Sequence, residues 1–453
     1  MINRYLKLQF VSALLFLLIF TSCNRNNDID NFSETPAERL SKTNAELKDA
    51  LTSSKDGWKI MYFTDNREFG GFTYLMSFTP DGKVKMVSDF DKASLVPETS
   101  DYEIQSSYAP ALVFTTRNKI HQLSNADNSP GRQEGAGYRG DFEFVFDKID
   151  EKGDIYFRTA RSNVGIVFTK AKAEDWNNLN KNFTTKENAL IGSSEQPFFS
   201  VLEIKEGGNI QSYSFSYDDI TRFITLTSED PSNSFNMKYG VGFKENSIIL
   251  SPAVKVGNEE LSELIYDSAN KAYIAKGKQG EVVMKFVDKP VDPAQFGLGK
   301  EILEGKRLDI GHVKPFIDMD INGGNTTTAL NVVKNILNAK KNPVTRINIR
   351  FNYPESGQVV NKIEYIFADQ IILHYVDIAK GENNAIILKD NRWSSTPVPE
   401  SLKALDDYLL DPKGLLLKTE NYTVFYTNTI VTLKAVSSLS IRKTAFGLSY
   451  YKL

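Results

Sequence analysis

Apolar side chains follow two different periods along the chain, and the change from one period to the other marks a change of structure. In residues 35–53 they recur every three to four positions, which predicts an amphipathic helix. The segment opens with Thr35 and Pro36, and Glu38 stands three residues after Thr35, so a capping box should start the helix. From Trp58 onward the apolar positions alternate with a period of two, as expected for half-buried β-strands.

This alternation predicts a first antiparallel meander that runs to about residue 170. Its expected strands are 58–64, 72–79, 83–90, 100–107, 111–116, 141–149, 154–160 and 165–169. Turn residues at 79–82 and 150–153 fit hairpin connections, and 171–180 has the pattern of a short helix. Strands in unbroken meander order indicate an up-and-down, lipocalin-like barrel or a strongly curved sheet.

A second meander and a mixed part complete the predicted fold. The clearest strands of the second meander are 198–204, 212–217, 223–227, 236–243, 247–250 and 281–286. Two prolines in 288–293 mark a boundary. The remainder mixes helices at 327–339 and 401–408 with strands at 347–352, 362–367, 370–376, 385–388, 423–426, 430–435 and 438–442. The prediction is a mainly β protein, with an N-terminal helix, tandem meanders in 34–185 and 186–290, and a C-terminal α+β part in 291–453.

The N-terminus has the pattern of an export signal. Residues 10–20 are almost wholly apolar but too few to span a bilayer, which takes about 20 residues. The sequence from Phe20 to Cys23 resembles the bacterial lipobox, with phenylalanine where leucine is usual. That resemblance implies removal of the signal peptide 1–22 and lipid on Cys23, followed by a polar tether over 23–33. An ordinary signal peptide with a chance cysteine is the alternative.

Composition narrows the chemistry further. Cys23 is the single cysteine, so its acylation would exclude disulfides, cysteine nucleophiles and thiolate metal sites from the mature chain. The formal charge is -3 and no basic patch occurs, so nucleic acid is not an expected partner. The expected partner is the lipid bilayer, reached through Cys23.

Several short motifs resemble lipoproteins of the Bacteroidetes type that carry the domain of unknown function 4302. The motifs are Asp56-Gly57-Trp58, Gly70-Gly71-Phe72-Thr73-Tyr74, Ser107-Tyr108-Ala109-Pro110, Ile120-His121-Gln122-Leu123-Ser124 and Gly135-Ala136-Gly137-Tyr138-Arg139-Gly140-Asp141-Phe142-Glu143-Phe144. The sequence departs from the family at residues 123–126, where the family tends to Phe-Ser-Asp-Pro. The resemblance covers residues 34 to about 170. It implies an outer-membrane lipoprotein, often beside nutrient-uptake proteins, and supplies no catalytic residues.

The long connection at 122–140 interrupts an otherwise tight meander, and loops of this length are often functional. The candidate ligand-binding residues in or beside it are His121, Arg132, Tyr138, Arg139 and Asp141. Arginine would bind a carboxylate or sulfate, and tyrosine an apolar ring. The alternative is a structural loop whose glycines and aspartates form turns.

A candidate calcium site lies further along the chain. Asp318, Asp320 and Asn322 match the first half of a calcium-binding loop, in which oxygen ligands alternate. The twelfth position, which should supply a bidentate carboxylate, is Ala329. A strand that ends in an Asn-Gly-Gly turn explains the pattern more simply.

No motif for an established catalytic chemistry occurs. The three histidines, His121, His312 and His374, are far apart, and the chain has no nucleophile elbow, phosphate-binding loop or dinucleotide fingerprint, so no cofactor is expected. The leading hypothesis is a non-enzymatic binding or accessory lipoprotein of an outer-membrane uptake system for glycan or peptide. The alternatives are a hydrolase that acts on glycan or peptide through Asp and Glu carboxylates, and a structural envelope protein.

Overall fold

The computed structural model describes residues 34–106, 109–131, 134–193, 195–228, 237–313, 344–426, 429–440 and 443–452. Cys23, Arg132, the candidate calcium ligands Asp318, Asp320 and Asn322, and the helix expected at 327–339 lie outside the described residues. Within these ranges, no helix combines the length and apolar character needed to cross a membrane.

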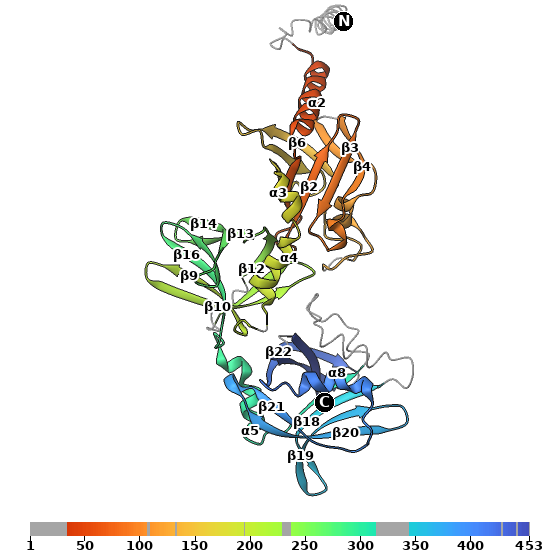
Figure 1. The fold of residues 1–453 in the computed structure, drawn as a ribbon, viewed down its shortest axis with the longest axis vertical. Coiled ribbons are helices and arrows are strands. Elements are labelled where there is room, and N and C mark those ends of the chain that lie inside the picture. Colours follow the sequence, from red (N-terminus) through yellow and green to blue (C-terminus); the bar gives the residue numbers. More distant parts are fainter. Residues whose placement is uncertain are drawn as a thin grey trace, which may run out of the picture.

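The chain is mainly β and forms three closed antiparallel barrels of eight strands each, one after another (Figure 1). The first barrel consists of β1 (Trp58–Phe63), β2 (Gly71–Phe78), β3 (Lys83–Ser88), β4 (Glu98–Ser106), β5 (Pro110–Phe114), β6 (Glu143–Ile149), β7 (Ile155–Thr159) and β8 (Gly165–Lys170). Its strands pair in sequence order, and β8 closes on β1. Of the two forms expected for this part, a barrel or a strongly curved sheet, the structure has the up-and-down barrel.

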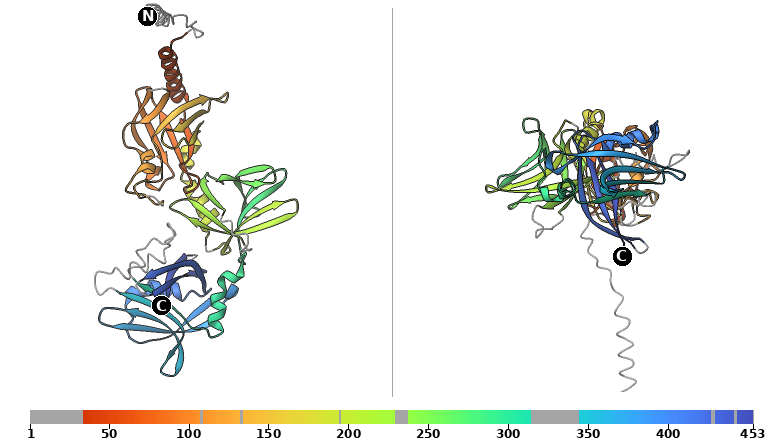
Figure 2. Two further views of the ribbon diagram at one scale, coloured as in Figure 1. Left: turned by 180° about the vertical axis from the view of Figure 1, so that it is seen from behind. Right: turned by 90° about the horizontal axis from the view of Figure 1, so that it is seen from below.

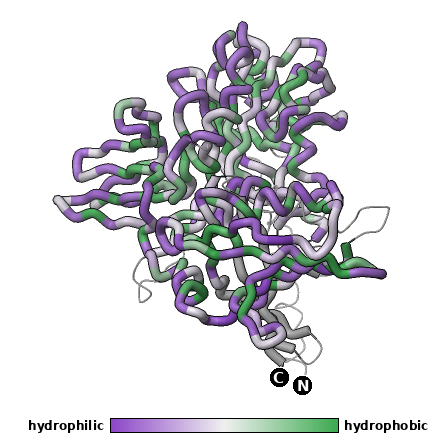
Figure 3. The backbone as a smooth tube through the Cα atoms, turned by 60° about the horizontal axis from the view of Figure 1, so that its bottom comes forward, coloured by the Kyte–Doolittle hydropathy of each residue, from purple (hydrophilic) through white to green (hydrophobic). Residues whose placement is uncertain are grey.

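The second and third barrels repeat the up-and-down order. The second consists of β9 (Phe199–Glu206), β10 (Asn209–Asp218), β11 (Phe223–Ser228), β12 (Lys238–Phe243), β13 (Ser247–Val256), β14 (Glu259–Asp267), β15 (Ala272–Lys276) and β16 (Gly280–Val287). The third consists of β17 (Leu308–Val313), β18 (Arg346–Glu355), β19 (Gln358–Ile366), β20 (Ile371–Lys380), β21 (Ile386–Trp393), β22 (Leu415–Tyr426), β23 (Thr429–Ser438) and β24 (Lys443–Lys452). Figure 3 shows hydrophilic and hydrophobic positions alternating along many of these strands.

Helices cap and connect the barrels. The long ones are α2 (Pro36–Ser53) before the first barrel and α8 (Glu400–Leu409) between β21 and β22. The short ones are η1 (Ala93–Leu95), η2 (Lys119–Ser124), α3 (Ala173–Asn178), α4 (Lys181–Lys186), η3 (Glu187–Ile191), η5 (Pro293–Phe296), α5 (Gly297–Leu303) and η6 (Glu382–Asn384). The capping box at the start of α2 is confirmed, because the Thr35 side chain accepts from the Glu38 amide and the Glu38 carboxylate accepts from the Thr35 amide.

The interior of the first barrel is filled by its own aromatic side chains. Trp58, Tyr62, Tyr74 and Phe144 are almost fully buried there. The indole of Trp58 donates to the carbonyl oxygen of Leu51 at 2.8 Å, which ties α2 to the barrel. Burial of such large rings is the main stabilising term of a barrel core, at roughly 25 cal/mol per Å² of apolar surface.

The structure differs from the sequence-based expectations at three places. Strands β14, β15, β17 and β24 were not predicted; in β14 only Leu264 is buried, so the strand shows no regular alternation. A strand was expected at 438–442, but β23 ends at Ser438 and the chain turns at Leu439 and Ser440. The C-terminal part does combine helices with sheet, but its sheet closes into a third barrel that the sequence did not indicate.

The third barrel is weakly joined between β21 and β22. In the described residues these two strands share a single register pair, Ile386 with Leu415. The segment that connects them includes α8, and Leu402, Leu405 and Leu409 of this helix are buried in the barrel core. Beyond Ile386, β21 therefore runs to Trp393 without β22 beside it.

Candidate functional site

The loop between β5 and β6 holds the candidate ligand-binding residues, and the structure gives each described one a partner. The ring of Tyr138 is 4% exposed and packs against Phe69, Phe72 and Phe90, with ring centroids 5.3, 5.4 and 5.3 Å away. Burial raises the pKa of Tyr138 to about 12. Tyr138 is thus part of the wall of the first barrel.

Asp141 is 2% exposed and binds backbone amides. Its Oδ1 accepts from the amide of Phe142 at 2.8 Å, and its Oδ2 accepts from the amide of Arg161 at 2.8 Å. The Asp141 amide in turn donates to the hydroxyl of Tyr62 at 3.0 Å. These bonds join the loop to the turn between β7 and β8, as a buried carboxylate with donors around it would be expected to do.

Arg139 has a positive φ of 56° and turns its guanidinium toward two acids of the first barrel. Its Nη1 lies 2.8 Å from Asp65 Oδ2, and its Nη2 lies 2.8 Å from Glu68 Oε2. Hydrogen bonds from Arg67 and then from Arg139 lower the pKa of Asp65 to about 2, against the effect of burial. The arginine that was expected to meet an anionic ligand is therefore paired within the chain.

His121 lies in η2, on the other side of the same loop. Its ring stacks on Phe142 with centroids 4.6 Å apart, and its Nδ1 lies 3.0 Å from Asn118 Oδ1. Burial, followed by the charge of Arg117, lowers its pKa. His121, Tyr138, Arg139 and Asp141 thus order the loop against its own barrel.

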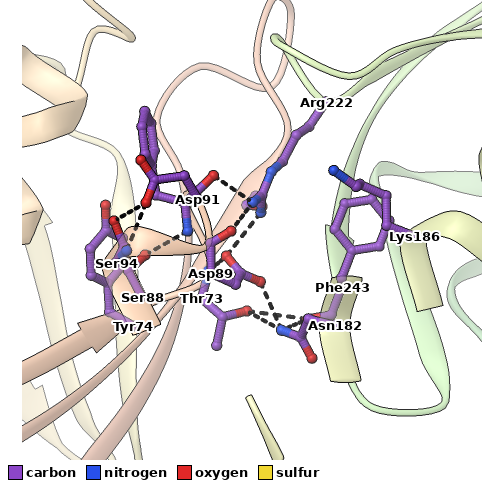
Figure 4. A network of polar contacts seen from close by, with 12 residues as sticks. Thr73, Tyr74, Ser88, Asp89, Asp91, Ser94, Asn182, Lys186, Arg222 and Phe243 are labelled. Carbon is purple, nitrogen blue, oxygen red and sulfur yellow. Dashed lines mark hydrogen bonds and ion pairs between the residues drawn. The ribbon is translucent and has the colours of Figure 1, made fainter. Parts of the chain in front are cut away.

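A buried polar junction, the polar joint, connects the first barrel to the second (Figure 4). Arg222, just before β11, places its Nη1 2.9 Å from Asp89 Oδ1 and 2.9 Å from the carbonyl oxygen of Gly71. Asn182 of α4 donates to Asp89 Oδ2 at 2.7 Å and to the carbonyl oxygen of Phe243 at 2.8 Å. The Asp89 carboxylate therefore receives donors from both sides of the junction.

Glycines allow the two barrels to approach at this joint. A Cβ atom on Gly240 of β12 would lie 2.7 Å from the carbonyl oxygen of Phe69, and one on Gly70 would overlap the carbonyl oxygens of Arg222 and Val241. The Gly70 amide donates to the carbonyl oxygen of Thr221 at 2.8 Å. Backbone thus contacts backbone, which leaves little freedom for one barrel to move against the other.

The junction between the second and third barrels, the apolar joint, is of a different kind. It is a small cluster of Phe199, Ala385 and Leu416, against which Phe198, Val287, Phe296 and Leu439 pack. The rings of Phe199 and Phe296 lie 5.6 Å apart.

A further polar cluster, the histidine cluster, lies in the third barrel next to the weak β21–β22 junction. His374 of β20 is fully buried; its Nδ1 is 2.7 Å from Asp406 Oδ1 of α8, and its Nε2 is 2.8 Å from Asp390 Oδ1 of β21. Tyr365 donates its hydroxyl to the same Asp406 oxygen at 3.1 Å. The indole of Trp393 stacks on the imidazole with centroids 4.0 Å apart and planes 13° apart.

The carboxylates of Asp406 and Asp390 stabilise the protonated form of His374. Burial alone would lower the pKa of His374, but its hydrogen bond to Asp406 and its attraction to Asp406 and Asp390 outweigh burial, so the pKa is raised. Burial also raises the pKa of Tyr365 well above its usual value. The imidazolium form thus lies between two carboxylates. The side chain of Asp406 is 16% exposed and that of Asp390 is 64% exposed.

Sequence reasoning noted His374 only as one of three separated histidines. Its partners Asp390 and Asp406 are 16 and 32 residues away, which matches no metal-ligand or catalytic spacing. The available signal was weak: a histidine at an inward position of an apolar strand has to find a polar partner. Over the part of the chain that the structure describes, no three His, Cys, Asp or Glu side chains group so that they could hold a metal ion.

Comparisons with known proteins give one family match. The model of a domain of unknown function, DUF4302, matches residues 28–268, more than half of the chain. The match spans the first barrel, the polar joint and most of the second barrel. No curated protein matches the chain.

Three solved structures with a partial likeness are DNA polymerase sliding clamps. The DNA polymerase III subunit beta of Pseudomonas aeruginosa is 8% identical, with 92% of this chain and 98% of that chain covered and a TM-score of 0.16. The sliding clamp of the same organism with ligand is 10% identical over 92% and 98% of the chains, with a TM-score of 0.17. The clamp of Bartonella birtlesii bound to griselimycin is 9% identical over 89% and 92%, with a TM-score of 0.14. These scores are too low to show a shared fold.

Proposed function

This chain belongs to the family of the domain of unknown function 4302, and on that premise we propose that it is a lipid-anchored protein of the Bacteroidetes outer membrane. Its role would be a non-enzymatic binding or accessory one in the uptake of glycan or peptide nutrients. Acyl chains on Cys23 would hold it at the bilayer, since two or more chains bind a membrane stably. Outer-membrane uptake proteins would be its neighbours.

One observation carries this proposal: helix α2, which follows the expected anchor, and the third barrel lie at opposite ends of the molecule. Helix α2, the first described element after the tether, projects beyond the first barrel, and the third barrel lies at the far end (Figures 1 and 2). The polar joint fixes the first barrel to the second, with Arg222 and Asp89 buried between them. Such an arrangement suits a protein that holds a binding barrel away from a membrane.

The anchor is tested by fractionation of cells that express the wild type or the Cys23→Ser variant. The wild type should be found in the outer membrane and should incorporate labelled palmitate. Cys23→Ser should incorporate none and should be released from the membrane or accumulate unprocessed. Membrane association of Cys23→Ser in a processed, unlabelled form would refute lipid anchoring.

Binding is tested with the soluble fragment 24–453 on arrays of oligosaccharides and peptides. Retention on a defined set of glycans or peptides, without release of cleavage products, supports a binding role. A fragment that is folded by circular dichroism and is retained on neither array would refute it and would favour the structural role.

A hydrolase remains the second candidate because two carboxylates from different elements, Asp390 and Asp406, bind one imidazole. Binding is preferred because both nitrogens of His374 are occupied and the residue is fully buried, so the imidazole has no free nitrogen for a water molecule. Cleavage of array ligands by the wild type, lost in Asp390→Asn, would reverse this preference.

A further inference from the structure

We propose that Trp393 and Asp390 form a binding subsite for a neutral sugar ring at the rim of the third barrel. This inference rests on the proposed binding function and names the site and the class of ligand. Both residues belong to the part of β21 that runs past its single register pair with β22, Ile386 with Leu415. In the described residues, β22 does not pair with this part of β21.

The indole of Trp393 is held in a fixed orientation. His374 lies opposite it in the β20–β21 register and stacks on one of its faces at 4.0 Å. The ring of Tyr365 is nearly parallel to it, with planes 10° apart and centroids 6.0 Å apart. Since Trp393 is only half-buried while His374 is fully buried, the exposed part of the indole lies away from the imidazole.

His374 also holds the carboxylate of Asp390, which nevertheless remains exposed to solvent. Its Oδ1 lies 2.8 Å from Nε2 of His374, while its side chain is 64% exposed. An ionised carboxylate accepts about four hydrogen bonds, so capacity is left for a ligand. Asp406 binds Nδ1 of His374, and Asp390 is the partner of the second buried nitrogen, Nε2, which holds its carboxylate in place at the rim.

Residues fixed in advance bind ligands with less loss of conformational entropy than mobile ones. An indole presents an apolar surface, and a carboxylate beside it accepts hydrogen bonds from hydroxyl groups. A sugar ring carries both features, an apolar face of C–H groups and hydroxyls around its edge. The two residues thus match one ligand class.

The surrounding charges favour a neutral ligand over a cation. The imidazolium of His374 lies between the two carboxylates that it contacts, so a positive charge already stands beside Asp390. Lys389 and Arg392 pair with Asp377 and Tyr375 in the β20–β21 register and lie on the other face of β21. The guanidinium of Arg392 lies over the ring of Tyr375, 4.2 Å from its centroid. An amine bound to Asp390 would lie beside the imidazolium of His374 and be repelled by it, whereas a neutral ring would not.

The test measures the affinity of fragment 24–453 for neutral oligosaccharides that retain it on a glycan array. Trp393→Ala and Asp390→Asn should each weaken that affinity about tenfold or more, which corresponds to about 1.4 kcal/mol. Trp393→Phe should keep most of it, because a ring remains. Two matched controls are Asp407→Asn, on an aspartate that is 63% exposed in α8, and Trp176→Phe, on a half-buried tryptophan beside the first barrel.

The outcomes separate this inference from the proposed function. If wild type binds glycans and all variants bind alike, the subsite is wrong and the binding role stands. Retention on charged glycans or peptides alone overturns the neutral sugar as ligand, and no retention on any array overturns both proposals. Because Trp393→Ala lowers packing in the core, its near-UV circular dichroism has to match that of wild type; if it does not, Asp390→Asn and Trp393→Phe decide.

Discussion

Arg222 of the second barrel and Asp89 of the first form a buried ion pair, with Nη1 and Oδ1 2.9 Å apart and side chains 4% and 1% exposed. The same guanidinium lies over the ring of Phe72, 4.3 Å from its centroid, and 5.4 Å from that of Phe243. Replacing only one residue of such a buried pair is costly, because the charge of the other residue then stays buried without its partner. The joint between the barrels is therefore sensitive to single substitutions.

Arg222→Met should lower the free energy of unfolding of fragment 24–453 by about 3–5 kcal/mol, since it leaves the Asp89 carboxylate buried without its cation. The measurement is urea unfolding followed by far-UV circular dichroism, read at the first transition. Adding Asp89→Asn should restore part of the loss, because it removes the uncompensated charge. Lys244→Met is the matched control: Lys244 and Glu263 form an exposed pair at 2.9 Å, worth less than about 1 kcal/mol. Equal effects of Arg222→Met and Lys244→Met would contradict this account.

Gly240→Ala should also destabilise the polar joint, by about 1–3 kcal/mol, because its Cβ would lie 2.7 Å from the carbonyl oxygen of Phe69 and neither backbone can easily move. Gly165→Ala in β8 provides the control, since no atom lies within 4 Å of its Cβ position. The control should change the melting temperature of the fragment little in either direction. A melting temperature of Gly240→Ala equal to that of the control would show that the barrels do not approach this closely.

The sequence predicts those parts of the fold that depend on neighbouring residues, and it does not predict pairings between distant strands. The capping residues Thr35 and Glu38 and the alternating strand from Trp58 act locally, and their structures were predicted from spacing alone. The closure of the third barrel depends on β17 pairing with β24, for example Gly311 with Leu448, and no local pattern encodes a pairing over such a separation.

At the candidate site, too, local features could be predicted and long-range contacts could not. The loop was located from its length, but Arg139 pairs with Asp65, 74 residues away, and with Glu68, and no local pattern indicates these contacts. The histidine cluster joins residues of four elements, β19, β20, β21 and α8. Long-range contacts, rather than residue types, thus decide which polar groups are paired within the chain.

His374 should make the stability of the protein fall as pH rises above about 6.5. Its pKa is raised in the folded chain, so its contribution is fully present below the unfolded value of about 6.5 and is lost as pH rises through the higher folded value. His121 should act in the opposite direction, because its pKa is lowered, so its contribution is lost as pH falls below about 6.5. Melting temperatures between pH 5 and 9 test both signs when wild type is compared with His374→Gln and His121→Gln. A His374→Gln curve parallel to wild type above pH 6.5 would refute the pairing of His374 with Asp390 and Asp406.

Asp65 should titrate at about pH 2, well below the usual aspartate value of about 3.9. Its folded pKa is depressed, so the stability that it contributes is present above about pH 3.9 and is lost as pH falls toward 2. Carbon-13 NMR of labelled aspartate carboxyl groups measures this midpoint directly. Arg67→Ala should raise it most, because the hydrogen bond from Arg67 is the largest cause, and Arg139→Ala should raise it less. Arg158→Ala, at an exposed pair with Asp147, should leave it unchanged.

The residues of the polar joint, from Gly70 to Phe243, all lie within the stretch that the family model matches, whereas the whole third barrel lies beyond it. Mutations that alter the third barrel leave the contacts of Arg222, Gly70 and Gly240 intact. The terminal barrel can therefore diverge, or be replaced by another module, at little cost to the pair before it. We expect relatives to inherit the first two barrels as one unit and to differ most in the third barrel.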